Sequence, residues 1–251
     1  MPPNTIDSFD VDPEARENSS KIINTIPQVT LENADSYGLK VFQSSLNLLA
    51  HILIGATVGI SILFAFRNGL PLGSTPLHIV LCVLGYQLLM AEAILCLCPH
   101  NGWSANLRLF DKKVAHTVLQ VLGSALAIAG SFIKSIDKRV NWNTLHGQFG
   151  LVALVFTSVC LVNGIASFYA YNLRKYLPGN LSKISHICFG IVAFGASCIS
   201  LCYGFDKNSF KNWASKEFAY AIMGFTSCFT FIIIINPTIT FFSKTARVLR
   251  K

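Results

Sequence analysis

The chain has 251 residues, of which 52% are hydrophobic and 13% are charged, and its net charge is +8 at pH 7. Soluble domains usually carry about 25% charged residues, so this composition indicates a membrane protein. The basic residues lie singly or in small groups between apolar segments, which argues against a nucleic-acid partner.

Residues 1–40 form a polar segment with seven acidic and three basic residues. The segment contains proline and few aromatic residues, so it has too little apolar surface to form a core of its own. We predict a flexible tail over residues 1–40. A membrane domain over residues 41–243 and a basic C-terminal segment over residues 244–251 are expected to follow.

Six apolar segments follow the tail, and each has about 20 or more residues, enough for a helix to cross ~30 Å of hydrocarbon. In chain order they are Ser44–Phe66, Thr75–Leu97, Val114–Ile133, Asn143–Ala170, Ile184–Phe205 and Phe218–Ser243. Backbone groups in lipid must be satisfied internally, and these lengths exclude strands. The sequence therefore predicts an all-α membrane protein with six transmembrane helices.

The segments that connect these spans differ in their lysine and arginine content between the two sides of the membrane. The side with both termini, residues 98–113 and residues 171–183 carries thirteen of these bases, and the other side carries seven. The positive-inside rule therefore predicts that both termini lie in the cytosol.

Four of the six histidines lie at two depths within the predicted spans, two near each side of the membrane. His78 and His146 lie near the outer ends of the second and fourth spans, and His116 and His186 lie near the cytosolic ends of the third and fifth. At 1.5 Å per residue the two depths differ by roughly 20 Å, so the four imidazoles cannot share one metal ion. The spacing suits two separate sites, His78 with His146 and His116 with His186.

A haem between two helices needs an imidazole on each side of its iron and small residues where the ring meets the backbone. A glycine lies four or seven residues after each histidine, on the same helical face. These glycines are Gly85, Gly123, Gly150 and Gly190. The positions eighteen residues after each histidine, at the opposite depth of the same face, are Cys96, Lys134, Gly164 and Gly204. Glycine is frequent in membrane helices, so this pattern supports haem sites without proving them.

Two further ionisable residues lie within the spans. His51, in the first span, has no histidine at a matching depth, and we interpret it as a polar contact between helices. Glu92 lies fourteen residues after His78, near the same stripe of the helix. A carboxylate at that depth is expected to be protonated, paired with a cation or near a haem edge, or else to reach the aqueous boundary.

With these residues in view, the chain resembles the cytochrome b561 family, especially its branch of six-span, ascorbate-dependent transmembrane reductases. The resemblance runs from about Ala50 to Arg247, and its specific part is the spacing of four histidines over spans two to five. Supporting segments are Ala50–Ile52, Leu89–Ala93, His146–Gly150 and Ser185–His186. The residues that flank His78 and His116 depart from the family pattern, which leaves the substrate preference open.

The resemblance implies that spans two to five form a four-helix bundle around two haem b groups. His78 and His146 would ligate the outer iron, and His116 and His186 the cytosolic iron. The implied activity is that of a transmembrane ascorbate ferrireductase or monodehydroascorbate reductase, with cytosolic ascorbate as donor and ferric iron or monodehydroascorbate as acceptor. The resemblance also admits a homodimer, and it favours the endoplasmic reticulum or another endomembrane over the plasma membrane.

Basic residues near each haem are candidates for substrate binding. A cationic rim on the cytosolic side would attract anionic ascorbate. Its candidates are Arg108, Lys112, Lys113, Arg174 and Lys175. On the outer side, Lys138 and Arg139 are candidates for binding the acceptor. The alternative role of all these bases is to fix the topology.

Two haem-free functions also fit the residues. A six-span transporter would use the membrane histidines and Glu92 as a proton relay, and its purified form would be colourless. A scaffold within a membrane complex would need the histidines only for assembly. An absorption spectrum recorded before and after the addition of ascorbate distinguishes these two functions from electron transfer.

Overall fold

The computed structural model describes residues 13–169 and 179–250, and no strand occurs among them. Six of its helical segments are long and apolar enough to cross a membrane, which confirms the predicted all-α fold with six spans. They are Tyr37–Ala65, Ser74–Leu95, Leu109–Asp137, Leu145–Ser167, Leu181–Phe205 and Lys216–Leu249. The third and sixth spans continue beyond the predicted limits, because a helix extends into the polar interface more readily than it begins anew.

The first span is the C-terminal part of the helix α1 (Pro13–Ala65). Of the predicted flexible tail, residues 13–40 are helical and residues 1–12 lie outside the described residues, so the flexibility of residues 1–40 stays a prediction. The chain divides into two units between Gln43 and Ser44. The unit that begins at Ser44 contains all the candidate site residues and is described below by itself.

The second span is not a regular α-helix. It consists of α2 (Ser74–Cys82), the π-helix η1 (Val83–Met90) and α3 (Ala91–Leu95). In a π-helix each N–H bonds to the carbonyl five residues earlier, so the turn holds more residues than an α-helical turn. The residues after η1 therefore face a different direction from the one that an α-helical period predicts.

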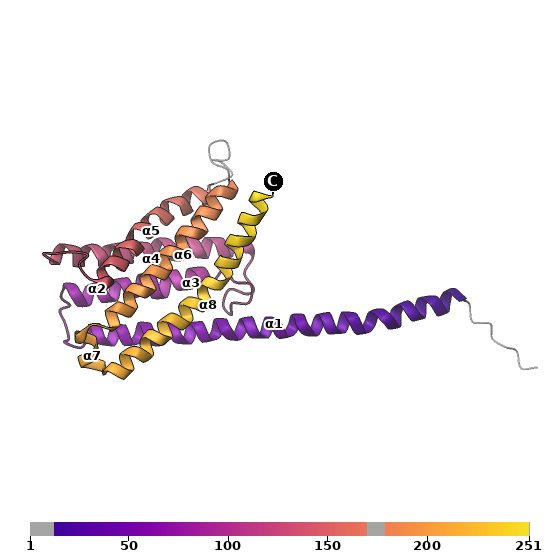
Figure 1. The fold of residues 1–251 in the computed structure, drawn as a ribbon, viewed down its shortest axis with the longest axis horizontal. Coiled ribbons are helices and arrows are strands. Elements are labelled where there is room, and N and C mark those ends of the chain that lie inside the picture. The colour runs from indigo at the N-terminus through magenta and orange to yellow at the C-terminus, as the bar shows by residue number, and fades with distance from the viewer. Residues whose placement is uncertain (1–12, 170–178, 251) are drawn as a thin grey trace, which may run out of the picture. The chain divides into compact units, whose positions relative to one another are not determined.

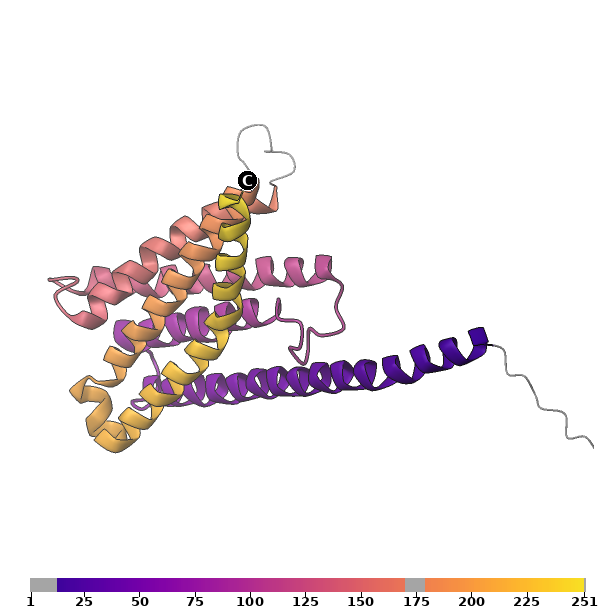
Figure 2. The ribbon, with the colours of Figure 1, turned by 45° about the vertical axis from the view of Figure 1, so that its right-hand side comes forward.

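Spans two to five form two helix pairs (Figures 1 and 2). In one pair α4 (Leu109–Asp137) packs along α2 and η1, and in the other α5 (Leu145–Phe168) packs along α6 (Gly179–Phe205). The α4 and α5 helices also touch, which joins the pairs into a four-helix bundle.

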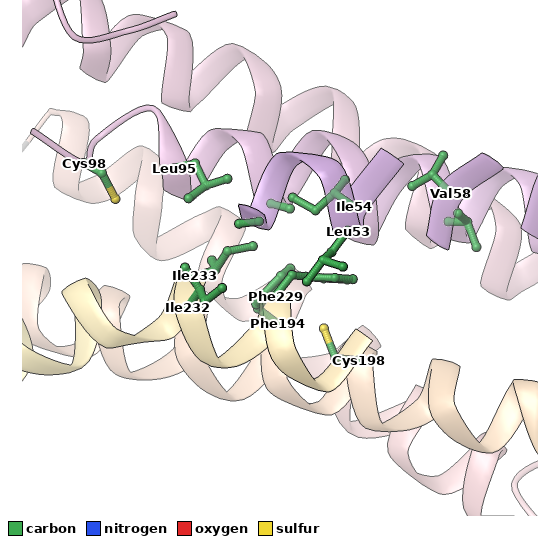
Figure 3. Packing of buried hydrophobic residues seen from close by; sticks show 13 residues of the cluster. Leu53, Ile54, Val58, Leu95, Cys98, Phe194, Cys198, Phe229, Ile232 and Ile233 are labelled. Atoms are coloured by element: carbon green, nitrogen blue, oxygen red, sulfur yellow. The ribbon is translucent and has the colours of Figure 1, made fainter. Parts of the chain in front are cut away.

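Spans one and six pack against this bundle through an apolar cluster (Figure 3). The sixth span is α8 (Lys216–Leu249), which lies along α6. The labelled members of the cluster are Leu53, Ile54, Val58, Leu95, Cys98, Phe194, Cys198, Phe229, Ile232 and Ile233. Lipid is as apolar as these side chains, so the cluster stabilises the fold mainly through van der Waals packing.

A short helix that was not expected from the sequence lies at the His78 end of the domain. This helix, α7 (Asn208–Ala214), follows the fifth span, and its Phe210 is buried against three other rings, those of Phe64, Phe205 and Trp213. The ring centroid of Phe210 lies 5.0 Å from that of Phe64 and 4.8 Å from that of Phe205. The segment is short and partly polar, so its helical state depends on these tertiary contacts.

Candidate functional site

The four histidines predicted to lie at two depths meet in two pairs. The rings of His78 and His146 have centroids 6.0 Å apart and planes at 89°, and those of His116 and His186 have centroids 6.2 Å apart and planes at 83°. His78 and His116 come from one helix pair, whereas His146 and His186 come from the other. Each histidine pair therefore bridges the two helix pairs.

The separation of the rings fits a metal ion held between them. A first-row metal binds an imidazole nitrogen at about 2 Å, and the ring centre lies roughly 1 Å beyond that nitrogen. Two imidazoles on opposite sides of one haem iron thus have ring centres about 6 Å apart. The observed 6.0 and 6.2 Å agree with this spacing at both ends of the bundle.

Backbone carbonyl groups fix the tautomer of the two histidines in the first helix pair. His78 donates from Nδ1 to the carbonyl oxygen of Gly130 at 2.9 Å, and His116 donates from Nδ1 to that of Ala93 at 2.7 Å. A carbonyl oxygen only accepts, so Nδ1 carries the hydrogen in both rings. The Nε2 atoms are then the nitrogens that can bind a metal.

The second helix pair repeats this arrangement. His146 donates from Nδ1 to the carbonyl oxygen of Ser200 at 2.8 Å, and His186 Nδ1 faces both the backbone and the Sγ atom of Cys160, the latter at 3.3 Å. In all four cases the anchoring residue lies on the other helix of the same pair. Each helix pair therefore presents two imidazoles whose orientation is set within that pair.

The π-helix shifts the position of one of these anchoring residues along its helix. In spans three to five, the anchoring residue lies fourteen residues after the histidine of its own helix. This holds for Gly130 after His116, Cys160 after His146 and Ser200 after His186. In span two the anchor is Ala93, fifteen residues after His78, and η1 lies between them. The π-helix accommodates the extra residue, so Ala93 takes the place that an unbroken α-helix would give to Glu92.

Glu92 consequently turns toward the first span. Its Oε1 atom lies 2.7 Å from Nδ1 of His51, and its Oε2 atom accepts a hydrogen bond from Nε1 of Trp103 at 3.0 Å. The other ring nitrogen of His51, Nε2, lies 2.7 Å from Oδ1 of Asn101. Of the environments predicted for Glu92, the structure shows pairing with a potential cation, and His51 makes the predicted polar contact between helices.

Two of the glycines expected to accommodate a flat ring lie against the imidazoles. A Cβ atom added at Gly164 would lie 3.0 Å from Cε1 of His186, and one added at Gly204 would lie 3.4 Å from Nδ1 of His146. Both glycines stand eighteen residues after the histidine of their own helix, so each touches the histidine of the neighbouring helix at the opposite depth. These positions leave no room for a large side chain beside the rings.

The glycines closer to each histidine serve helix packing. A Cβ atom added at Gly85 would lie 2.6 Å from the carbonyl oxygen of Gly123, so these two residues allow η1 and α4 to approach closely. Gly150 and Gly190 face the side chains of the anchoring residues Ser200 and Cys160, respectively. The predicted small-residue stripe is thus present, but most of it lies between the helices of one pair.

A cavity of about 360 Å³ opens beside His78 and His146. Of the two bases predicted to bind an outer acceptor, Lys138 lines this cavity, whereas Arg139 is not among its lining residues. Lys207, which was not among the candidates from the sequence, also lines this cavity. Burial and then the charge of Lys138 lower the pKa of Lys207. Because two lysines that repel each other share this cavity, it favours an anion.

The bases predicted near the other histidine pair do not all gather there. Arg108 forms an ion pair with Asp111, with Nε 2.8 Å from Oδ2. Lys112 is buried, and its Nζ atom lies 3.4 Å from the carbonyl oxygen of Cys98, whereas Lys113 is exposed. Arg174 and Lys175 lie outside the described residues. Lys112 and Arg108 thus have partners of their own, and a role of the five bases in binding a donor stays a prediction.

Comparison with known proteins identifies the family. The sequence model described as eukaryotic cytochrome b561 matches residues 77–211, more than half of the chain and all four paired histidines. The chain belongs to the cytochrome b561 family. Members of this family are b-type haem proteins, and the donor set found at each histidine pair, two neutral imidazoles, suits a haem iron.

Named relatives of this cytochrome b561 are reductases. Transmembrane reductase CYB561D2 of Homo sapiens is 27% identical, over 68% of this chain and 77% of that protein, and its Mus musculus counterpart is 29% identical over the same shares. An Arabidopsis thaliana protein named probable transmembrane ascorbate ferrireductase 4 is 33% identical, over 47% of this chain and 50% of that protein. The chain is therefore a transmembrane oxidoreductase of the branch that resembles CYB561D2, and it transfers electrons across a membrane.

With the His116–His186 and His78–His146 pairs as candidate haem sites, replacing Gly164 with leucine is expected to weaken haem binding at the first pair, and replacing Gly204 with leucine should weaken it at the second. Each new side chain must displace a ring that its Nδ1 anchor holds in place, and disturbing the support of a ligand costs about tenfold or more in affinity. Haem-to-protein ratios and redox titrations of the purified variants measure the effect. The control is Gly59→Leu, because nothing lies within 4 Å of a Cβ atom there. Equal losses at both sites in either variant would contradict the expectation.

Proposed function

We propose that this cytochrome b561 transfers electrons from cytosolic ascorbate to ferric iron or monodehydroascorbate on the luminal or extracellular side, and that it holds two haem b groups. In this proposal His78 and His146 bind the outer iron, and His116 and His186 bind the cytosolic iron. The observation that carries it is the ring separation of 6.0 and 6.2 Å in two histidine pairs at opposite ends of one bundle. The haem-free transporter has no comparable support, because the carboxylate of Glu92 bonds to His51 and to none of the four paired histidines among the described hydrogen bonds.

When bound, each haem supplies a one-electron redox couple. The paired histidines would hold the iron from both helix pairs and would leave it no position for oxygen or a substrate, so the group would serve electron transfer alone. The four Nδ1 anchors hold the imidazoles in place. Between the two pairs, the bundle contains a buried cluster of one aromatic ring and small or flexible side chains. Its buried members are Tyr86, Met90, Ala127, Ala153 and Ala196.

The proposed substrates rest on the name of one relative and on the basic residues of this chain. The plant relative is named as an ascorbate ferrireductase, which supports ascorbate as donor and ferric iron as acceptor. Lys138 and Lys207 at the outer cavity support an anionic acceptor, such as a ferric chelate. The excess of basic residues on the side of both termini supports a cytosolic position for them. The membrane that we propose is the endoplasmic reticulum or another endomembrane.

Purified protein in sealed vesicles provides the test. With a ferric chelate and a ferrous indicator trapped inside, ascorbate added outside is expected to reduce the haem and then to produce internal ferrous iron. Ascorbate is an anion at neutral pH and crosses lipid slowly, so the signal depends on the protein. Vesicles without protein are the control. A colourless preparation from cells supplied with haem precursors would contradict the proposal and favour the haem-free transporter.

A further inference from the structure

A partly buried acid–histidine pair lies beside the His116 site but takes no part in binding iron. Oε1 of Glu92 lies 2.7 Å from Nδ1 of His51, and the two side chains are 19% and 25% exposed, respectively. The residue after Glu92 is Ala93, whose carbonyl oxygen anchors Nδ1 of His116 at 2.7 Å. The pair is therefore adjacent along the backbone to the group that orients a candidate iron ligand.

Both ring nitrogens of His51 face oxygen atoms. Nδ1 faces the carboxylate of Glu92, and Nε2 faces Oδ1 of Asn101, each at 2.7 Å. Asn101 is fully buried, and its amide nitrogen donates to Oγ of Ser104 at 2.9 Å, which leaves its oxygen toward the ring. An imidazole with an acceptor at each nitrogen is satisfied only when both nitrogens carry hydrogen. The arrangement therefore suits an imidazolium paired with the Glu92 carboxylate.

The other charged and titratable groups around the pair come from the following loop and from α4. In the loop, Cys96 bonds to carbonyl groups through its Sγ atom, and the Sγ atom of Cys98 accepts a hydrogen bond from Asn236 of α8. Lys112 of α4 directs its Nζ atom to the carbonyl oxygen of Cys98, and Arg108 is paired with Asp111. The hydrogen-bonded counter-charge of Glu92 is thus a histidine, the side chain whose charge changes most readily near neutral pH.

We propose that the Glu92–His51 pair accepts the proton that the electron donor releases at the His116–His186 site, an inference that rests on the proposed function. Monohydrogen ascorbate becomes the ascorbyl radical anion by losing one electron and one proton. The electron reduces ferric iron to ferrous iron. The proton leaves a donor hydroxyl group and binds a carboxylate oxygen of Glu92. The added negative charge at the iron and the added positive charge at the pair attract each other across a partly buried region, so each step favours the other.

Stopped-flow reduction of the haem by two donors tests the inference. Glu92→Gln preserves the shape of the side chain but removes the proton acceptor. We expect about 100-fold slower reduction by ascorbate, the scale of general base catalysis. Reduction by hexaammineruthenium(II), which transfers an electron without a proton, should stay within about twofold of wild type, because this donor needs no base. An unchanged rate with ascorbate, or equal slowing with both donors, would overturn the inference.

An equilibrium measurement gives a second readout. Infrared difference spectra between the oxidised and reduced protein are expected to contain a protonated carboxyl band in wild type and to lack it in Glu92→Gln. Glu217→Gln, which changes an exposed acid in the first turn of α8, serves as the control and should retain the band. The reduction potential of the His116–His186 site should fall as pH rises in wild type and depend less on pH in Glu92→Gln. The same pH dependence in both proteins would reject proton uptake at Glu92.

A milder variant covers the case in which Glu92→Gln does not fold. Trp103→Phe removes only the hydrogen bond to Oε2 and keeps the carboxylate. With that oxygen free to accept a proton, reduction by ascorbate should become faster while reduction by hexaammineruthenium(II) stays unchanged, and the same effect on both donors, or none on either, would overturn the inference. Failure of the proposed function is a separate result, because it appears as wild-type protein that ascorbate does not reduce.

Discussion

Replacing His116 with alanine is expected to remove one of the two proposed haem groups, so that the purified protein retains about half of the wild-type haem. The reason is that each histidine pair is a separate candidate site with one imidazole from each helix pair, so the proposed iron would lose one of its two protein ligands. His78→Ala should remove the other haem, and the double variant should be colourless. Haem-to-protein ratios and redox titrations measure the outcome.

The matched control is another histidine at the same end of the domain. His100 lies in the loop between α3 and α4, so His100→Ala should retain the full haem content. The assignment fails if His116→Ala and His186→Ala each keep both haem groups. Loss of both haem groups from His116→Ala alone would show that the two sites are not independent, which the separate anchors do not predict.

Replacing Gly85 with alanine is expected to destabilise the protein by about 3 kcal/mol, the upper part of the usual range for overpacking. The added Cβ atom would lie 2.6 Å from the carbonyl oxygen of Gly123 and 2.8 Å from the amide nitrogen of Ala127. Both are backbone atoms, so η1 and α4 must move apart. That movement also lengthens the hydrogen bonds that anchor His78 and His116, so haem affinity should fall at both sites.

Thermal unfolding in detergent measures this loss of stability, and Gly59→Ala provides the control. Gly59 lies in the part of α1 that crosses the membrane, and nothing lies within 4 Å of a Cβ atom added there. Alanine in a helix is favoured over glycine by roughly 0.5–1 kcal/mol, so the control should be neutral or slightly stabilising. Similar unfolding temperatures for the two variants would show that the crossing of η1 and α4 is not as tight as the structure indicates.

The number of spans and the depth of the candidate ligands follow from the order of amino acids alone. Lipid leaves a buried backbone no partner outside its own helix, so the length and hydropathy of a segment decide whether it crosses the membrane. Depth follows from position along a helix of fixed rise, which is why the match of His78 with His146 and of His116 with His186 could be predicted. The rings meet in these pairs in the structure.

The direction in which the residues after the π-helix face depends on contacts between helices. The sequence placed Glu92 near the stripe of His78, but η1 shifts the register by one residue, so Ala93 anchors His116 and Glu92 meets His51. One extra residue in a helical turn does not change the hydropathy of the segment, so hydropathy does not reveal the π-helix. Packing between helices selects it, through the close contact of Gly85 with Gly123 and the anchors on the neighbouring helix. Contacts of this kind join residues far apart in the chain, so they cannot be predicted from the hydrophobic periodicity within one segment.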